Sequence, residues 1–200
     1  MAAAARVHPP SLDGALLGEV VVRTATCPRE RVAEDVVEIL GIAPGDAVLE
    51  LGCGSGRMLS VVAGRLREGR ALGIDPSELM VRHARLRLSR WIAAGRVDVR
   101  VGGSEELGSL APSGFDAVFG VHVVYFWEDP RQHLAEVRRV LRPGGRLLLG
   151  FWPGDGAPSD RARFDPARVE RCLGEAGFDA IRSELRSERG RPLAWIQARG

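Results

Sequence analysis

Residues 47–57 read Ala47-Val48-Leu49-Glu50-Leu51-Gly52-Cys53-Gly54-Ser55-Gly56-Arg57 in this 200-residue chain. The first five residues are mostly apolar and predict a buried parallel strand. Glycines at alternate positions allow the backbone to turn sharply, and allow a ligand to approach where a Cβ atom would collide. A helical repeat follows the glycines, with apolar residues at Leu59, Val62 and Leu66. A strand, a glycine turn and a helix in this order predict an α/β protein that binds an adenosine-type cofactor.

The glycine spacing separates two cofactor classes. The dinucleotide fingerprint is Gly-x-Gly-x-x-Gly, whose last glycine allows close packing of helix on strand. Here Gly56 comes one position early, and Arg57 stands where the fingerprint requires glycine. Glu50 adds a carboxylate on the ligand side of the turn, which would repel a pyrophosphate but attract a sulfonium and an ammonium group.

The segment resembles the signature loop of class I S-adenosylmethionine-dependent methyltransferases. The alternative is a structural strand–turn–helix with incidental glycines. The residues that the resemblance places at an S-adenosylmethionine site are Glu50, Gly52, Cys53, Gly54 and Gly56. Cysteine at the second of these loop positions is implied to pack there rather than to act as a nucleophile.

An acidic residue ends the second apolar segment. Residues 70–74 run into Asp75-Pro76-Ser77, roughly 20 residues beyond the glycines, where a carboxylate can accept both ribose hydroxyl protons. Asp75 can also be the N-cap of the next helix, with Pro76 in the first helical position. The two roles are compatible, because a capping residue at a strand's carboxyl end also faces the ligand. We therefore place Asp75 and Pro76 at the cofactor.

Strands and helices alternate along the chain. Further apolar segments predict strands at 97–101, 115–119, 146–151, 180–185 and 193–198. Helical stripes separate the first three strands from one another, the fourth from the fifth and the fifth from the sixth, which predicts a doubly wound, mostly parallel seven-stranded sheet with helices on both faces. No full helix separates the last two strands, so we expect a C-terminal antiparallel hairpin. This arrangement resembles the seven-stranded methyltransferase sheet over residues 29–200.

Composition narrows the classes of partner. The chain has 28 Lys and Arg residues against 26 Asp and Glu residues, and no basic stripe interleaved with aromatics, which argues against nucleic-acid binding. No apolar run is long enough to span a bilayer. Cys27, Cys53 and Cys172 lack the spacing of metal ligands. We expect a cytoplasmic enzyme domain over residues 29–200, with no metal and no membrane partner.

The resemblance extends to the loops after the third and fourth strands. The family often has an acid after the third strand that reaches the adenine amino group, but this chain has Gly103 at that position. Ser104, Glu105 or backbone groups would then contact the adenine. After the fourth strand, the backbone from Gly120 through Val121 to His122 is expected beside the methionine moiety.

The loop after the fourth strand also indicates the kind of acceptor. Relatives that methylate amino groups of nucleic-acid bases or glutamine carry Asp/Asn-Pro-Pro-Tyr/Phe here, which Gly120-Val121-His122-Val123 does not match. Residues 129–146 match a run that is frequent in the branch that methylates small molecules. We therefore expect methyl transfer to a small-molecule substrate.

Methyl transfer from a sulfonium is an in-line displacement, which needs positioning and, for a protonated acceptor, a base. His122 is the candidate base, because histidine titrates near neutral pH. The alternative is a histidine that is only a hydrogen-bonded wall residue. Tyr125, the only tyrosine, is the candidate for orienting the substrate or lining its pocket.

Two segments are expected to cover the acceptor: residues 1–28, which include a partly disordered start, and the Gly- and Pro-rich residues from 152 onward. The apolar residues 16–22 could fold over the site or pair with a second subunit in a homodimer. Two other functions stay open. One is a non-catalytic module of this fold that binds S-adenosylmethionine or a partner protein, and the other is a nicotinamide-dependent oxidoreductase, which Arg57 disfavours.

Overall fold

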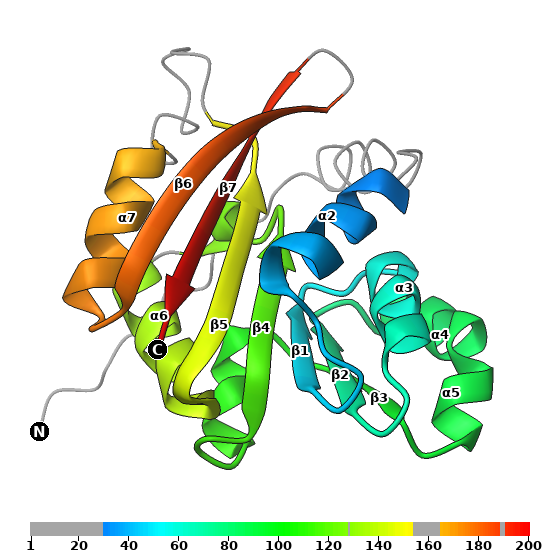
Figure 1. The fold of residues 1–200 in the computed structure, drawn as a ribbon. Coiled ribbons are helices and arrows are strands. Elements are labelled where there is room, and N and C mark those ends of the chain that lie inside the picture. Colours follow the sequence, from blue (N-terminus) through cyan, green and yellow to red (C-terminus); the bar gives the residue numbers. More distant parts are fainter. Residues whose placement is uncertain (1–29, 128, 154–164, 189–190) are drawn as a thin grey trace, which may run out of the picture.

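The computed structural model describes residues 30–127, 129–153, 165–188 and 191–200. These residues form a seven-stranded sheet in the order β3-β2-β1-β4-β5-β7-β6, with helices on both faces (Figure 1). The strands are β1 (Ala47–Leu51), β2 (Arg70–Asp75), β3 (Val97–Val101), β4 (Phe115–Val121), β5 (Leu141–Phe151), β6 (Asp179–Glu188) and β7 (Arg191–Arg199). The helices are α2 (Glu30–Leu40), α3 (Arg57–Arg65), α4 (Glu78–Arg87), α5 (Ser89–Ala93), α6 (Pro130–Val140) and α7 (Pro166–Glu175), with 3-10 turns η1 (Ser104–Ser109) and η2 (Val124–Phe126).

The sheet has the predicted topology. Strands β1 to β5 are all parallel to one another, whereas β7 lies antiparallel between β5 and β6. The chain runs from β1 outward to β3 and then returns to β4 on the other side of β1. In doubly wound sheets, ligands bind outside the carboxyl ends of the strands at such a reversal. The fold therefore directs attention to the ends of β1, β2 and β4.

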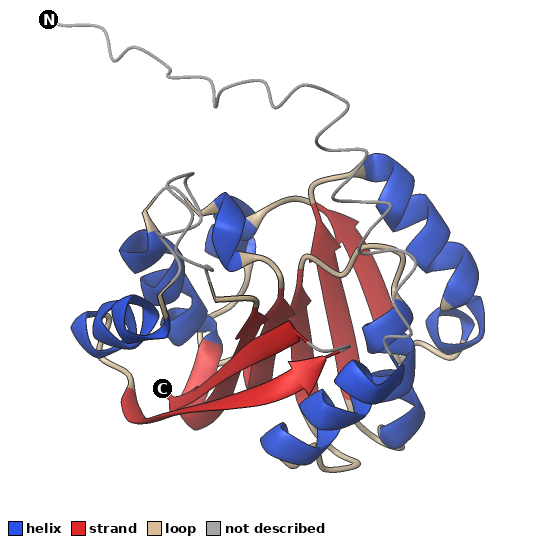
Figure 2. Cartoon of the chain, turned by 90° about the horizontal axis from the view of Figure 1, so that it is seen from above, coloured by secondary structure: helices blue, strands red, loops and turns tan. Residues whose placement is uncertain are grey.

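The central strands are buried on both faces, which explains their nearly continuous apolar sequence. In β1, Val48 packs with residues of α2 to α5, whereas Leu49 and Leu51 pack with residues of α6 and α7. Strand β5 alternates in the same way, with Leu148 on the first face and Leu149 on the second. Viewed from above, the helices lie on either side of the sheet (Figure 2).

Strand β5 differs most from its predicted bounds, 146–151. It begins at Leu141, so residues 142–145 also lie inside the strand. Hydrogen bonds from the Gly144 N–H to the Gly200 carbonyl (2.7 Å) and from the Gly200 N–H to the Gly145 carbonyl (3.0 Å) extend the ladder there. Between β2 and β3 the chain forms two helices, because the buried Leu88 ends α4 and precedes α5.

Some expectations fall on residues that the structure does not describe. The predicted cap at residues 1–28 lies outside the described residues, and so does most of the Gly- and Pro-rich segment after β5. Among the described residues, no helix combines the length and apolarity that crossing a membrane would require.

Candidate functional site

The loop after β1 contains three glycines in the left-handed backbone region. Gly52, Gly54 and Gly56 have φ of +64°, +52° and +74°, which side chains of L residues rarely adopt. A Cβ atom at Gly52 would lie 2.5 Å from Cγ1 of Val123, and one at Gly56 would lie 2.9 Å from Cδ1 of Leu88. A Cβ atom at Gly54 would meet nothing within 4 Å. Close packing therefore requires two of the glycines, and Gly54 is the point where the loop faces open space.

Asp75 fastens this loop to the end of β2. Its carboxylate is buried, with 8% of the residue exposed. Oδ2 accepts the Gly54 N–H at 2.7 Å, and Oδ1 accepts the Ser77 N–H at 3.0 Å. A carboxylate oxygen has two lone pairs, so each oxygen can accept one further hydrogen bond. The carboxylate is thus fixed at the carboxyl end of the sheet and can still accept hydrogen bonds from a ligand.

The capping role predicted for Asp75 is wrong. The N-cap of α4 is Ser77, whose hydroxyl accepts the Met80 N–H at 3.4 Å. The Asp75 carboxylate instead accepts the backbone N–H of Ser77, two residues further along the chain. This hydrogen bond forms an Asx-turn, which aspartate side chains favour. This turn delays the helix start to Glu78, and Pro76 stands before the helix rather than in its first turn.

A carboxylate and a thiol also belong to this region: Glu50 in β1 and Cys53 in the loop itself. Glu50 lies in β1 opposite Gly73 of β2 and is fully buried. Burial raises the pKa of the Cys53 thiol well above its usual range, and the nearby carboxylates of Glu50 and Asp75 raise it further. A thiol in this state is a poor nucleophile, since the thiolate is the reactive form. Cys53 packs as a small apolar side chain, as the family resemblance implied.

Gly73 is a residue that the sequence analysis missed. A Cβ atom there would lie 2.8 Å from Cδ2 of Leu59 and 2.9 Å from Sγ of Cys53. The absence of a side chain on β2 lets the glycine loop pack closely against this strand. The available signal was a glycine inside the otherwise apolar run of residues 71–74.

The loop after β3 lies beside Asp75. The Gly102 N–H donates to the Asp75 carbonyl at 3.0 Å, which joins the ends of β2 and β3. Gly103 then precedes η1, and Ser104 and Glu105 are its first two residues. The structure therefore brings their backbone to the predicted end of the sheet. The side chains of Ser104 and Glu105 lie outside the described part of the molecule.

At the end of β4, glycine again permits a close approach. Gly120 pairs with Leu51 of β1, and a Cβ atom at Gly120 would lie 2.6 Å from Cγ2 of Val123. Val123 thus touches the positions of both Gly120 and Gly52. It fastens the loop after β4 to the glycine loop. Val121 is buried as the last residue of β4.

His122 follows β4 and has an unusual backbone conformation. Its φ is +62°, and its N–H donates to the Gly150 carbonyl of β5 at 2.7 Å. Its Nδ1 atom lies 3.3 Å from the Tyr125 hydroxyl oxygen. The imidazole ring also packs against the indole ring of Trp152, with 4.3 Å between ring centroids. The structure brings the two predicted catalytic residues together and adds Trp152, which the sequence analysis placed only at the start of a covering segment.

These observations fit the cofactor implied by the loop. Gly54 leaves space at the loop tip, Asp75 keeps acceptor capacity for hydroxyl groups, and Glu50 adds a second carboxylate on the adjacent strand. Two buried carboxylates favour a ligand with positive charge over one with a pyrophosphate. Among the described residues, no group of three or more His, Cys, Asp or Glu side chains could hold a metal ion.

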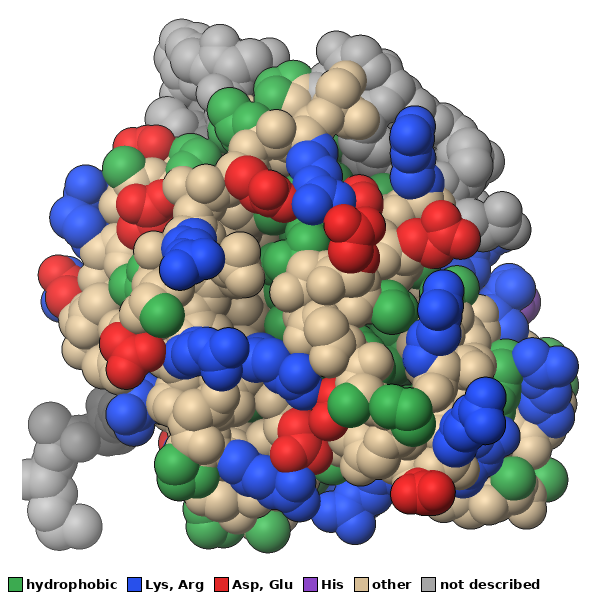
Figure 3. Space-filling view, viewed as in Figure 1, with side chains coloured by type: hydrophobic (Ala, Val, Ile, Leu, Met, Phe, Trp, Pro, Cys, Tyr) green, Lys and Arg blue, Asp and Glu red, His purple; other side chains and the backbone are tan. Residues whose placement is uncertain are grey.

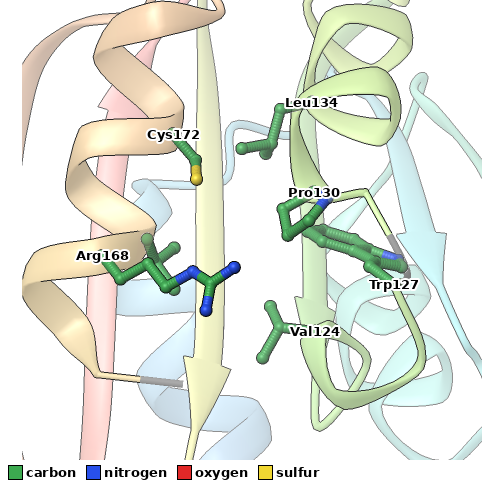
Figure 4. Close-up of a pocket in the computed structure, with 7 residues that line it drawn as sticks. Val124, Trp127, Pro130, Leu134, Arg168 and Cys172 are labelled. Carbon is green, nitrogen blue, oxygen red and sulfur yellow. The ribbon is translucent and has the colours of Figure 1, made fainter. Parts of the chain in front are cut away.

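Two hollows lie elsewhere in the molecule. One, between α6 and α7, is apolar and has a volume of about 10 Å³, room for one water; its lining includes Leu134 and Cys172 (Figure 4). The other is a groove of about 400 Å³ between the end of α2 and strands β5, β6 and β7, lined by Arg146, Arg182 and Arg199. Arginine side chains gather on this face of the molecule (Figure 3). Neither hollow includes a residue of the glycine loop or Asp75.

Known proteins with similar sequences include methyltransferases. Residues 49–149 match the family model described as a methyltransferase domain. The chain is 34% identical over 164 residues to a protein from Mycolicibacterium smegmatis named as a probable S-adenosylmethionine-dependent methyltransferase, covering 78% of this chain and 60% of that protein. It is 29% identical over 170 residues to an O-methyltransferase from Penicillium expansum, covering 79% and 61%.

A third curated relative is an uncharacterized 37.1 kDa transposon protein from Streptomyces fradiae, 40% identical over 135 residues, covering 67% of this chain and 38% of that protein. The chain therefore spans between 38% and 61% of the lengths of these three relatives. The crystal structure of a SAM-dependent methyltransferase from Aquifex aeolicus superposes with a TM-score of 0.73 at 22% identity, covering 90% of this chain and 97% of that one. That likeness shows a shared fold.

Proposed function

The chain belongs to the class I S-adenosylmethionine-dependent methyltransferase family, and on this premise we propose that it transfers a methyl group from S-adenosylmethionine to a small-molecule acceptor. One observation carries the proposal: the hydrogen bond of 2.7 Å from the Gly54 N–H to Oδ2 of Asp75. It holds the open tip of the glycine loop and a carboxylate together. They lie at the ends of β1 and β2, where doubly wound sheets bind nucleosides.

Each candidate residue has a task in holding the cofactor. The spare lone pairs of Asp75 accept the ribose hydroxyls, and Gly54 leaves room for the ligand. Glu50 favours the positive charges of the methionine part, with the backbone of Gly120 and Val121 alongside. Ser104, Glu105 or backbone groups of the loop after β3 contact the adenine. When bound, S-adenosylmethionine supplies a methyl group on a sulfonium centre that is already activated for displacement.

We propose His122 as the group that accepts a proton from the acceptor. It lies at the end of β4, next to β1, and histidine exchanges protons near neutral pH. An acceptor hydroxyl requires such a group, and the relative from Penicillium expansum is named an O-methyltransferase. The loop at residues 120–123 also lacks the two prolines typical of enzymes that methylate amino groups.

The domain boundaries at residues 29 and 200, the cytoplasmic location and a homodimer remain predictions from the sequence. The partial coverage of the relatives makes the activity of the whole protein a proposal as well. The small-molecule acceptor is supported by the printed names of relatives that act on small molecules, such as trans-aconitate 2-methyltransferase from Azoarcus.

Titration calorimetry with S-adenosylmethionine, S-adenosylhomocysteine and NADH tests the proposal. We expect both adenosyl ligands to bind and NADH to give no heat of binding. Binding of NADH alone would point to an oxidoreductase, and binding of none of the three would leave the loop as a scaffold for a partner-binding module. Binding without methyl transfer to any acceptor in a broad labelled-methyl screen would favour the non-catalytic module.

A pair of glycine variants tests whether the loop itself is the site. Gly54 and Gly41 both have left-handed backbones, with φ of +52° and +57°, and both face open space. Replacement with alanine should therefore cost each a similar ~1–2 kcal/mol of stability. Only Gly54→Ala should weaken S-adenosylhomocysteine binding, by about tenfold or more. Equal affinities in the two variants would remove Gly54 from the site.

A further inference from the structure

Strand β6 forms one edge of the sheet (Figure 1). On its inner side it pairs with β7 in a regular register from residue 182 to residue 188, and the register shift between Asp179 and Arg182 lies before this stretch. Among the described strands, none pairs with its outer side. A long, regular outer edge of this kind is a template for pairing with a further strand.

The geometry of the ladder determines which residues of β6 can bond a further strand. Ser187 pairs with Pro192, and because proline has no N–H, these two residues cannot exchange both N–H···O bonds. Hydrogen-bonded and non-hydrogen-bonded pairs alternate along an antiparallel ladder, so the pairs that Leu185 and Ser183 form with β7 are also non-hydrogen-bonded. The backbone N–H and C=O groups of these three β6 residues therefore point away from β7.

The charges along β6 alternate in sign. Residues 182–188 read Arg-Ser-Glu-Leu-Arg-Ser-Glu. Arg186 contacts Asp35 of α2 at 2.6 Å and Glu184 at 2.8 Å, so this row of charged residues lies on the α2 face of the sheet. Leu185 lies on the opposite face between two serines, and it is 66% exposed. Charges of a single sign on an edge would repel a second copy of the chain, whereas alternating charges attract one.

We propose that β6 pairs with β6 of a second copy of this chain, in the antiparallel sense and about a two-fold axis at Leu185. In this register Leu185 lies opposite its own counterpart, and Ser183 lies opposite the partner's Ser187. The outward-facing backbone groups of the two strands then meet and form about six hydrogen bonds between the chains. On the α2 face, Glu184 lies opposite the partner's Arg186, and oppositely charged cross-strand pairs are stabilising.

Other two-fold registers are disfavoured. An axis at Glu184 or at Arg186 would place like charges opposite each other, and would centre the pairing on residues whose backbone groups point toward β7. An axis at Ser183 would bring the irregular residues 179–181 into the ladder, and an axis at Ser187 would extend the ladder past residue 188, where β6 ends. The axis at Leu185 uses the regular stretch alone.

A concentration series in the analytical ultracentrifuge tests the proposal. One strand edge is a small interface, so the wild-type protein should change from monomer to dimer between roughly 1 and 100 µM. Glu184→Arg and Arg186→Glu each place like charges opposite each other, and each should raise the Kd of the dimer at least about tenfold. An equimolar mixture of the two variants should recover the dimer, because every charge at these positions then faces an opposite charge.

A cysteine pair tests the register without changing any charge. Position 185 meets its own counterpart at the proposed axis, so mild oxidation should link two copies of Leu185→Cys. Ser183→Cys is the matched control, because it is also exposed but its counterpart lies roughly 13 Å further along the strand. The wild-type protein in the same oxidant gives the background from its three native cysteines.

Three results would overturn the proposal: a wild-type protein that stays monomeric over the whole series, a dimer that Glu184→Arg leaves intact, or equal cross-linking at positions 183 and 185. The test is separate from that of the proposed function, because β4, β5 and β7 lie between β6 and β1 in the sheet. We expect Glu184→Arg to bind S-adenosylhomocysteine as the wild-type protein does.

Discussion

The three glycines of the loop after β1 differ in what an added Cβ atom would meet. Gly52, Gly54 and Gly56 are alike in sequence and in backbone conformation, but two face neighbouring side chains and one faces open space. Asp75 is engaged by two backbone N–H groups at the loop. A substitution at Asp75 therefore alters the loop as well as the proposed contacts with the ribose.

We predict that Asp75→Asn weakens S-adenosylhomocysteine binding by at least about tenfold and lowers stability by ~1–2 kcal/mol. The amide retains one acceptor oxygen, but its NH₂ group faces either the Gly54 or the Ser77 N–H and cannot bond it. Calorimetry and urea unfolding measure the two effects separately. A loss of stability with unchanged affinity would limit Asp75 to holding the loop.

Cys53 should be inert in the native protein. Its pKa is raised by burial and by the carboxylates of Glu50 and Asp75, and it is 3% exposed. We predict that iodoacetamide at pH 8 leaves Cys53 unmodified in the native protein and modifies it after unfolding in urea. Peptide mass spectrometry identifies the site. Rapid alkylation of native Cys53 would contradict both its burial and its raised pKa.

At the scale of the elements, the packing of β5 against Trp195 of β7 requires glycine at position 150. A Cβ atom at Gly150 would lie 2.6 Å from Cζ3 of Trp195, a side chain that is 1% exposed on β7. We predict that Gly150→Ala destabilises the protein by ~1–3 kcal/mol, measured by urea unfolding, because a large ring in a packed core has no space to move.

Gly64 provides a matched control for this substitution. It lies inside α3, and a Cβ atom there would meet nothing within 4 Å. Gly64→Ala should therefore stabilise the protein by up to ~1 kcal/mol through helix propensity. A double variant that also carries Trp195→Phe should recover part of the stability lost in Gly150→Ala. Equal effects at the two glycines would exclude the contact with Trp195 as the cause.

Asp116 connects three strands at the opposite end of the sheet from the candidate site. Oδ2 accepts the Ala47 N–H of β1 at 2.8 Å, and Oδ1 pairs with Arg142 of β5. Burial alone would raise the pKa of Asp116, but these partners, with Arg146 nearby, outweigh it and lower the pKa below its ordinary value. A lowered pKa in the folded state stabilises the protein at pH values above the unfolded-state pKa, near 3.9.

We predict that Asp116→Asn destabilises the protein by ~1 kcal/mol at pH 7. The difference from the wild-type protein should shrink as the pH falls from about 4 through the folded-state pKa, because the wild-type carboxyl group is then protonated and resembles the amide. Urea midpoints measured from pH 7 to pH 3 give both curves. A difference that stays constant over this range would assign the effect to packing rather than to charge.

The sequence predicted the elements better than the contacts between them. Alternating apolar strands and helices gave the seven-stranded sheet, and the glycine spacing led to the loop and Asp75. A glycine inside an apolar run singles out Gly73, but its role and that of Trp152 depend on which side chains meet across strands, and no local pattern carries that information. The capping role of Asp75 failed for the same reason, because Ser77 offers an equally good cap two residues later.

At the scale of the whole molecule, ligand binding should appear as added stability. A ligand that binds only the folded state, at about 100 times its Kd, stabilises a protein by ~2.7 kcal/mol. For a chain of 200 residues this corresponds to a rise of roughly 5–11 °C in Tm. We predict such a rise with S-adenosylhomocysteine and none with NADH in thermal unfolding. The Gly54→Ala protein should show a smaller rise than Gly41→Ala at the same ligand concentration.

The order of the strands has a consequence for how this chain folds while it is being synthesised. Strand β7 comes last in the described sequence, yet it lies between β5 and β6 in the sheet. Strands β1 to β5 can assemble as soon as they leave the ribosome, but the outer edge of β5 then has no partner until residues 191–199 are made. An unpaired apolar edge is a template for pairing with another chain. The nascent protein is therefore most prone to aggregate in the interval between the synthesis of β5 and that of β7.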